Sequence, residues 1–413
     1  MRRSPLIVIF TTVFIDLVGF GIVIPVLPFY AEGTAFNATP RTVGLLFASY
    51  SIMQLIFSPI LGGLSDKHGR RPVLLLSIIG TGIGFLILGL ATTVWMLFIG
   101  RILDGITGGN ISTAQAYIAD ITTEENRAKG MGLIGAAFGL GFIFGPAIGG
   151  ILSHWGIHVP FFFAATLCFA NAVLLYFRLP ETVTADHPAK HSAAGGRSLR
   201  HVLDSLKQPK LAFVLSIYFL FIVAFSIMTT SFSLYTMFRF GYDAQHTGYL
   251  FAYVGVIAVI IQGGLIGRLV KRFGEIPLVI FGALCFAISL FAVPFVGPAA
   301  GGLGALLIGG GVFSMGNSLA TPALTSLASK SVGAAEQGVV LGVTQSTASL
   351  ARAVGPSLTA ILISSSIAHL GADGVLHYMS DRSLFVTFWT GAGIMFVASL
   401  LASYYTKVSR NVL

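Results

Sequence analysis

Uncharged apolar stretches of roughly twenty residues recur along the chain, and they restrict its possible folds more than any other feature. Val43–Leu61 and Val73–Gly100 contain no charged residue at all. A helix needs about 20 apolar residues to cross a bilayer, and within lipid only helices and closed barrels satisfy their own backbone. Barrel strands alternate polar and apolar residues, whereas these stretches are continuous. The sequence therefore predicts an all-α integral membrane protein.

The charges agree with this prediction. Only 9% of the residues are charged and the mean hydropathy is +0.88, whereas soluble domains carry about 25% charged residues. A net charge of +9 would also suit a nucleic-acid-binding protein. Most of the 24 lysines and arginines, however, fall in segments predicted to be cytoplasmic. This asymmetry predicts a multi-pass protein with both termini in the cytoplasm and no nucleic-acid partner.

We predict two six-helix bundles, residues 1–178 and 211–413, joined by a cytoplasmic linker, residues 179–210. The first span carries Asp16 and lacks a cleavage-type end, so we interpret it as a span and not a signal peptide. Cys168 and Cys285 lie in apolar spans and imply no disulfide. The twelve predicted spans are Leu6–Tyr30, Val43–Leu61, Val73–Thr93, Val94–Ile118, Met131–Ser153, Pro160–Phe177, Leu211–Phe238, His246–Leu265, Ile276–Val296, Ala300–Leu319, Gly338–Ala368 and Leu384–Tyr405.

The two halves share short motifs. Gly62-Gly63-Leu64 followed by Gly69 recurs as Gly263-Gly264-Leu265 followed by Gly274, and Gly145-Pro146 recurs as Gly355-Pro356. Internal duplication of this kind is typical of transporters whose halves rock about a central site. It can also be a mere record of gene history.

Four ionisable residues fall inside spans: Asp16, Arg101, Asp104 and Arg352. Each costs at least ~2.5 kcal/mol at the bilayer centre, so we expect each to face the protein interior. One interpretation is that they neutralise one another and fasten helices together. The other is that a carboxylate carries a proton, and this is the interpretation we favour for Asp16. For Asp104 the question stays open, because Arg101 lies on the same helix face and offers a structural partner.

The loop Gly62–Pro72 is a basic turn that also contains an acid, Asp66. Membrane topology requires only the cations, and Gly69 permits the tight reversal. Asp66 also suits the N-terminus of the following helix. We predict a cytoplasmic latch that would close this end of the protein in an outward-open state. The alternative is solvated surface charge, worth less than ~1 kcal/mol per pair. The predicted latch comprises Gly62, Asp66, Gly69, Arg70, Arg71, Asp120 and Arg127.

A row of glycines crosses the fifth predicted span. Gly141, Gly145 and Gly149 recur every four residues, next to Pro146 and Gly150. A bare helix face allows close backbone packing. The row can serve ordinary packing or form a seam between the halves, and Pro146 predicts a kink that favours the seam.

Polar and aromatic residues scattered through the spans are candidates for a substrate cavity, although such residues often only join helices. The sequence has no Walker loop, nucleophile elbow or metal-ligand spacing, so we expect no catalytic residue, cofactor or metal. The cavity candidates are Gln54, Asn110, Gln115, Tyr117, Phe225, Gln262, Asn317, Gln345 and Arg352.

The whole chain resembles the drug–proton antiporters of the major facilitator superfamily, in particular the twelve-span tetracycline–proton antiporters. The resemblance implies that Asp16 is the span-1 acid and Arg101 the span-4 arginine. It further implies the major facilitator fold, a plasma-membrane location and export of lipophilic compounds against inward proton flow. Four stretches carry it: Asp16–Pro28, Gly62–Pro72, Gly100–Gly108 with Tyr117–Thr122, and Gly141–Gly150, which holds the antiporter signature Gly-Pro-x-x-Gly-Gly.

The sequence also departs from the tetracycline carriers. Those carriers have acids in spans 3 and 9, whereas Thr81–Ile87 and Ile276–Val296 contain none. Asp104 stands where they have a small residue. A carrier for another solute, such as a sugar or siderophore, is therefore an alternative. A non-transporting scaffold or receptor is a further one, and it would need neither Asp16 nor Arg101. Whether the protein is a drug exporter or a carrier for another solute, we expect its partners to be a small molecule, protons and the bilayer. We also expect a monomer.

Overall fold

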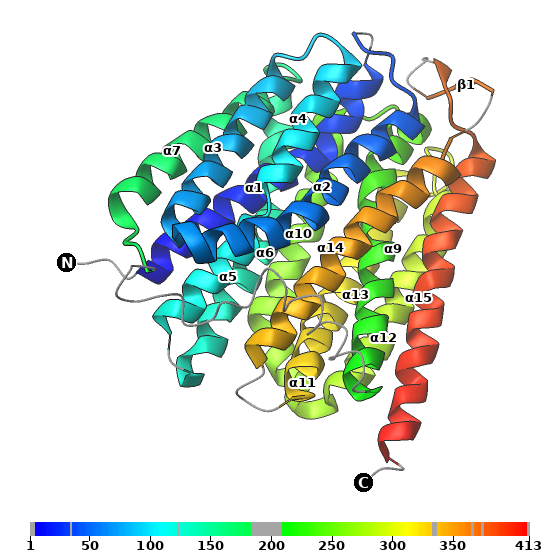
Figure 1. Cartoon of the computed structure of the whole chain (residues 1–413). Coiled ribbons are helices and arrows are strands. Elements are labelled where there is room, and N and C mark those ends of the chain that lie inside the picture. The colour runs from blue at the N-terminus through cyan, green and yellow to red at the C-terminus, as the bar shows by residue number, and fades with distance from the viewer. Residues whose placement is uncertain are drawn as a thin grey trace.

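The fold was analysed in a computed structural model, and it consists almost entirely of long helices (Figure 1). The structure describes residues 5–33, 35–122, 124–182, 209–332, 337–364, 367–372 and 376–410, except the side chains of 124–129, 131–132, 337–339, 341, 376 and 406–410. Its elements are α1 (Pro5–Glu32), α2 (Pro40–His68), α3 (Arg70–Gly89), α4 (Val94–Thr107), α5 (Asn110–Ile121), α6 (Glu124–Ser153), α7 (Val159–Arg178), α9 (Pro209–Phe240), α10 (Ala244–Ile260), a π-helical turn η1 (Ile261–Leu265), α11 (Ile266–Phe273), α12 (Glu275–Ala292), η2 (Val293–Phe295), α13 (Gly302–Lys330), α14 (Gln337–Leu362), β1 (His369–Leu370), β2 (Leu376–His377) and α15 (Asp381–Arg410).

These helices account for the twelve predicted spans, and the all-α membrane fold is confirmed. Among the described residues, ten helical segments are long and apolar enough to cross a membrane by themselves. The fourth span is divided into α4 and α5, which are both too short for that test. Span 11, α14, is polar for a membrane helix, with Gln345, Ser349 and Arg352 in its middle.

Helices α1–α7 pack together as one bundle and α9–α15 as another. The two bundles meet where α2 packs against α14 and α6 against α10. Figure 1 shows both termini toward one end of the molecule and the β1–β2 hairpin at the other; we call these the terminal end and the hairpin end. The predicted linker lies mostly outside the described residues, since only 179–182 and 209–210 are described.

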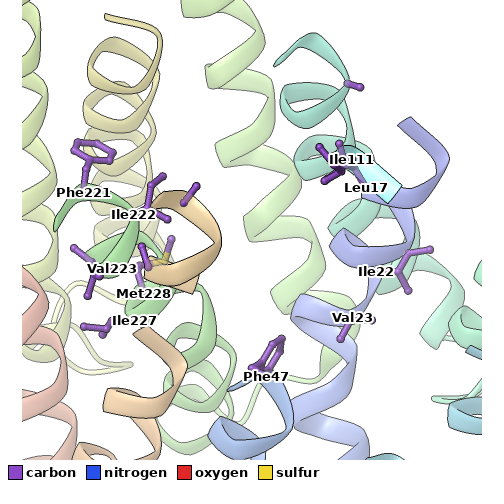
Figure 2. Packing of buried hydrophobic residues seen from close by; sticks show 14 of the residues in the cluster. Leu17, Ile22, Val23, Phe47, Ile111, Phe221, Ile222, Val223, Ile227 and Met228 are labelled. Carbon is purple, nitrogen blue, oxygen red and sulfur yellow. The ribbon is translucent and has the colours of Figure 1, made fainter. Parts of the chain in front are cut away.

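Apolar side chains fill both bundles and also cover the outside. Figure 2 shows Leu17, Ile22 and Val23 of α1 in the same buried cluster as Phe221 and Ile227 of α9. Cys168 and Cys285 are free and buried. Large apolar residues are exposed on the outer faces of many helices, among them Trp95, Phe177 and Ile308. An apolar exterior of this extent suits a lipid environment.

Several predicted boundaries were wrong. Gly62 and Gly63 do not end the second span, because glycine costs only about 1 kcal/mol in a helix, and α2 continues to His68. The helix ends at Gly69, whose φ of +101° strongly favours glycine. Span 10 runs on to Lys330, whereas span 11 ends early at Leu362.

The fourth span is broken at Gly108–Gly109. Gly105 and Gly109 pack directly on the α2 backbone, at Tyr50 and Ser58. The amide of Gln54 compensates for the break, since its Nε2 donates to the carbonyl of Gly108 at 2.9 Å. Broken helices are tolerated in membranes where a neighbour satisfies the freed backbone in this way.

Candidate functional site

A cavity of about 700 Å³ lies between the two bundles, with walls from both. Apolar and aromatic side chains make up most of its wall, and polar groups are few, a composition typical of small-molecule sites. Six of the predicted cavity residues line it: Gln115, Phe225, Gln262, Asn317, Gln345 and Arg352.

The other three candidates lie outside this wall. Gln54 is buried and joins helices, because its Nε2 donates to Tyr50 Oη at 2.9 Å as well as to Gly108. Tyr117 is buried near the terminal end, where its hydroxyl donates to the carbonyl of Pro180 at 3.0 Å. Asn110 is buried at the start of α5. Gln54 and Tyr117 therefore fit the alternative of joining segments of the bundle, which the sequence had left open.

A row of aromatic rings crosses the cavity from one bundle to the other, and the sequence analysis named only one of its members, Phe225. The ring centroids of Phe20 and Phe142 are 5.7 Å apart, those of Phe142 and Phe225 5.6 Å, and those of Phe225 and Phe313 6.1 Å. The chain has 34 phenylalanines, so composition could not select these. The spacing of Phe20, one helical turn beyond Asp16, is the only signal that could have found it.

The intramembrane charges do not form one neutral cluster. Arg101 is completely buried, and its Nη1 lies 2.7 Å from Asp104 Oδ2. Its guanidinium also lies over the ring of Tyr50, 4.2 Å from the centroid. Arg101 and Asp104 therefore pair, as the structural interpretation of Asp104 requires.

Asp16 is 9% exposed and makes no ion pair with any described cation. Asp104 and Asn110 lie near it. Tyr50 contacts the ring of Phe20, with 5.4 Å between centroids, and so connects the buried charges to the cavity wall. Asp16 is thus a buried acid that makes no ion pair with a described cation, in contrast to Asp104.

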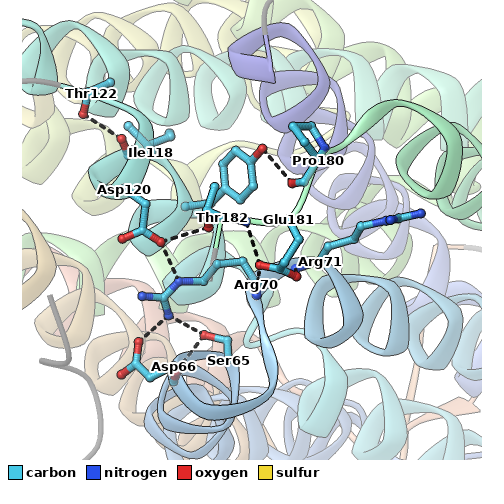
Figure 3. Close-up of polar contacts among 12 residues, drawn as sticks. Ser65, Asp66, Arg70, Arg71, Ile118, Asp120, Thr122, Pro180, Glu181 and Thr182 are labelled. Atoms are coloured by element: carbon cyan, nitrogen blue, oxygen red, sulfur yellow. Dashed lines mark hydrogen bonds and ion pairs between the residues drawn. The ribbon is translucent and has the colours of Figure 1, made fainter. Parts of the chain in front are cut away.

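Arg70 is the centre of the predicted latch, and it is completely buried (Figure 3). It forms ion pairs with Asp66 and, at 3.0 Å, with Asp120, and its Nη1 donates to Ser65 Oγ at 2.7 Å. The alternative of solvated surface charge is thus wrong for this residue. Asp66 lies in the last turn of α2, four residues before α3 begins, and pairs with Arg70, the first residue of α3. The side chain of Arg127 lies outside the described residues.

Glu181 occupies the N-terminus of α3, and the sequence analysis missed it. Its two carboxylate oxygens accept hydrogen bonds from the backbone N–H groups of Arg70, at 2.9 Å, and Arg71, at 3.0 Å. The next residue, Thr182, donates its hydroxyl to Asp120 at 3.1 Å. Arg71 turns the other way and donates to the carbonyl of Tyr176. The described charge network therefore joins α2, α3, α5 and the chain after α7, all within the first bundle (Figure 3).

The glycine row of α6 faces α1, a helix of its own bundle. A Cβ on Gly145 would lie 2.6 Å from the Cα of Gly21, and one on Gly141 would lie 2.5 Å from the Cβ of Leu17. The seam that we expected between the halves is formed instead by Gly150, whose Cβ would lie 2.7 Å from the Cα of Gly248 in α10. Pro146 contributes there with its carbonyl, 3.0 Å from a Cβ on Gly248.

The bundles separate steadily from the hairpin end to the terminal end. Between α6 and the segment from α10 to η1, close contact at Gly248 gives way to open space around the cavity-lining Gly263 of η1. Along α2 and α14, a Cβ on Gly44 would lie 2.7 Å from Ala360, whereas Gly342 has nothing within 4 Å. At the hairpin end, His377 Nδ1 lies 3.0 Å from Glu32 Oε2, and this contact bridges the two halves. The cavity is therefore closed at the hairpin end and widens toward the terminal end.

Two six-helix bundles with a cavity between them, closed at one end, define a multi-pass membrane transporter. The family model of the Major Facilitator Superfamily matches residues 9–356. The chain belongs to that superfamily, and it is a transporter.

Similar proteins cover nearly the full chain. Tetracycline resistance protein, class H, from Pasteurella multocida is 32% identical over 410 residues, 98% of this chain and 96% of the relative. Multidrug resistance protein 2 from Bacillus subtilis is 31% identical over 370 residues, 89% of this chain and 90% of the relative. Among solved structures, the human organic anion transporter MFSD10 (TETRAN) aligns with a TM-score of 0.69 and 23% identity, over 97% of this chain and 99% of the other.

Proposed function

We propose that the protein exports lipophilic compounds in exchange for protons, by alternating access of the central cavity. The observation that carries this proposal is Asp16, a buried acid without a described cationic partner, one aromatic layer behind the cavity. The apolar cavity suits lipophilic substrates. The names of the relatives, tetracycline resistance and multidrug resistance proteins, support the same substrate range.

The geometry corresponds to one state of the transport cycle. We place the terminal end in the cytoplasm, because lysines and arginines gather there in the sequence. The cavity then opens inward. We expect the protein to work as a monomer in the plasma membrane, because one chain forms the whole cavity, and to need no catalytic chemistry.

Inverted membrane vesicles with an imposed pH gradient test the proposal, with a panel of fluorescent lipophilic compounds that includes tetracycline. We expect Asp16→Asn to reduce gradient-driven accumulation to the level of empty vesicles. Exchange of compound across the membrane without a gradient should survive, because the cavity wall is unchanged. Asp243→Asn is the matched control, because this exposed acid at the start of α10 does not line the cavity and asparagine also caps a helix.

Retained proton-driven accumulation in Asp16→Asn would contradict the assignment of the proton site. The absence of gradient-driven movement of every compound by the unmodified protein would contradict the proposed function itself.

A further inference from the structure

The cavity wall carries one charge, and that charge is positive. Among the described residues that line the cavity, Arg352 is the only one with a charged side chain. The two acids inside the spans, Asp16 and Asp104, do not contribute to the wall. The surface that meets a substrate is thus apolar, with a single cation.

Arg352 has few protein partners. Its Nη2 donates to Ser349 Oγ at 3.3 Å, and its guanidinium lies 5.7 Å from the ring centroid of Phe138 in the other bundle. No described carboxylate forms an ion pair with it. The nearby titratable groups are the phenols of Tyr218 and Tyr50, which are neutral at physiological pH. The guanidinium therefore lacks a counter-charge within the described part of the chain.

The position of Arg352 on α14 directs it to the substrate space. Gln345, Arg352 and Pro356 line the same cavity, and their spacing of seven and four residues places them on one helix face. A cation within a membrane is costly and is retained where it serves a function. Arg101 shows the structural solution in this same protein, since it is fully buried against Asp104. Arg352 lacks such an acid and faces open space.

We propose that Arg352 is an anion-binding subsite and that the preferred substrates are lipophilic organic anions. The planar fork of N–H donors in a guanidinium matches a carboxylate or another oxyanion. The aromatic row from Phe20 to Phe313 would hold the apolar part of the molecule. This inference rests on the proposed export function, which identifies the cavity as the substrate site. It narrows the proposed substrates from lipophilic compounds in general to lipophilic organic anions.

Binding to the purified protein in lipid nanodiscs tests the subsite without any transport step. The probes are 1-pyrenebutyrate and its methyl ester, which share an aromatic body and differ in charge. We expect the unmodified protein to bind the acid about tenfold or more tightly than the ester, because the ester lacks the charge-assisted hydrogen bonds. Arg352→Gln should remove this preference by weakening the acid alone, and Arg352→Lys should retain part of it.

Arg268→Gln is the matched control, because Arg268 lies on α11 and does not line the cavity. It should leave both affinities unchanged. Equal affinity of the unmodified protein for acid and ester would overturn the inference, as would an equal loss of both probes in Arg352→Gln. Binding needs no proton gradient. The loss of the preference for the acid over the ester would therefore test the anion subsite, and a failure of gradient-driven accumulation would separately test the proposed export function.

Discussion

Two turns in the molecule have the same backbone conformation, but the side chains around them differ. Gly69 joins α2 to α3 and Gly274 joins α11 to α12, with φ values of +101° and +81°. In both, the glycine N–H bonds to the carbonyl four residues earlier, in Ser65 and Val270. The repeated motif of the sequence thus has a repeated geometry.

The side chains differ sharply. Around Gly69, a buried arginine pairs with two acids and Glu181 caps the next helix. Around Gly274, the corresponding helix α11 has no buried residue, and Glu275 pairs with the exposed Lys330. Duplication preserved the reversal of the chain, whereas among the described residues a buried arginine with two acids and a capping glutamate is found beside the first turn and not beside the second. We infer that the Gly69 turn is a rigid part of the first bundle. The Gly274 turn is held less firmly by the second bundle.

The largest difference between the turns should come from the arginines. Arg70→Ala leaves Asp66 and Asp120 without their shared cation, and breaking a buried pair of this kind costs about 3–5 kcal/mol. Arg272→Ala removes an exposed charge and should change the free energy of unfolding by less than ~0.5 kcal/mol. Thermal unfolding in detergent, with proton-driven accumulation in parallel, measures both variants. Equal destabilisation would remove the distinction between the two turns.

An intermediate difference should appear at the glycines themselves. Gly69→Ala and Gly274→Ala each force a side chain into a backbone region that costs about 1–3 kcal/mol. A Cβ on Gly69 would also lie 2.5 Å from a carboxylate oxygen of Glu181, whereas Gly274 has nothing within 4 Å. Gly69→Ala should therefore destabilise the protein more. In a Glu181→Ala background the excess should disappear, and its persistence would show that Glu181 is not the cause.

The smallest difference should come from the acid that caps α3. Glu181→Ala removes both acceptors from the first turn of that helix, and losing a cap costs about 0.5–2 kcal/mol. Lys330→Ala breaks only the exposed pair beside Gly274 and should cost less than ~1 kcal/mol. Unfolding midpoints of the two variants provide the comparison. A larger effect for Lys330→Ala would mean that the second turn is held as firmly as the first.

Local sequence signals predicted most of the fold and part of the site. Apolar stretches predicted the spans, and the rarity of charge in them singled out Asp16 and Arg352. Glu181 escaped prediction because its partners, Arg70 and Arg71, lie more than a hundred residues earlier in the chain. Phe142 and Phe313 could not be distinguished from the other phenylalanines until their neighbours were known. Gln54 looked like a cavity residue because the sequence does not reveal the helix break that it satisfies.

The π-helical turn Ile261–Leu265 joins α10 to the basic helix α11, and its residues Gln262 and Gly263 line the cavity. A helix of this kind accommodates one extra residue, and one residue corresponds to a rotation of about 100° around the helix axis. The turn therefore sets the azimuth of Arg268, Lys271 and Arg272 separately from that of the cavity-lining residues Ala258 and Val259 of α10. Were it to relax into a regular α-helix, these cations would rotate through more than a quarter circle relative to the cavity-lining residues of α10.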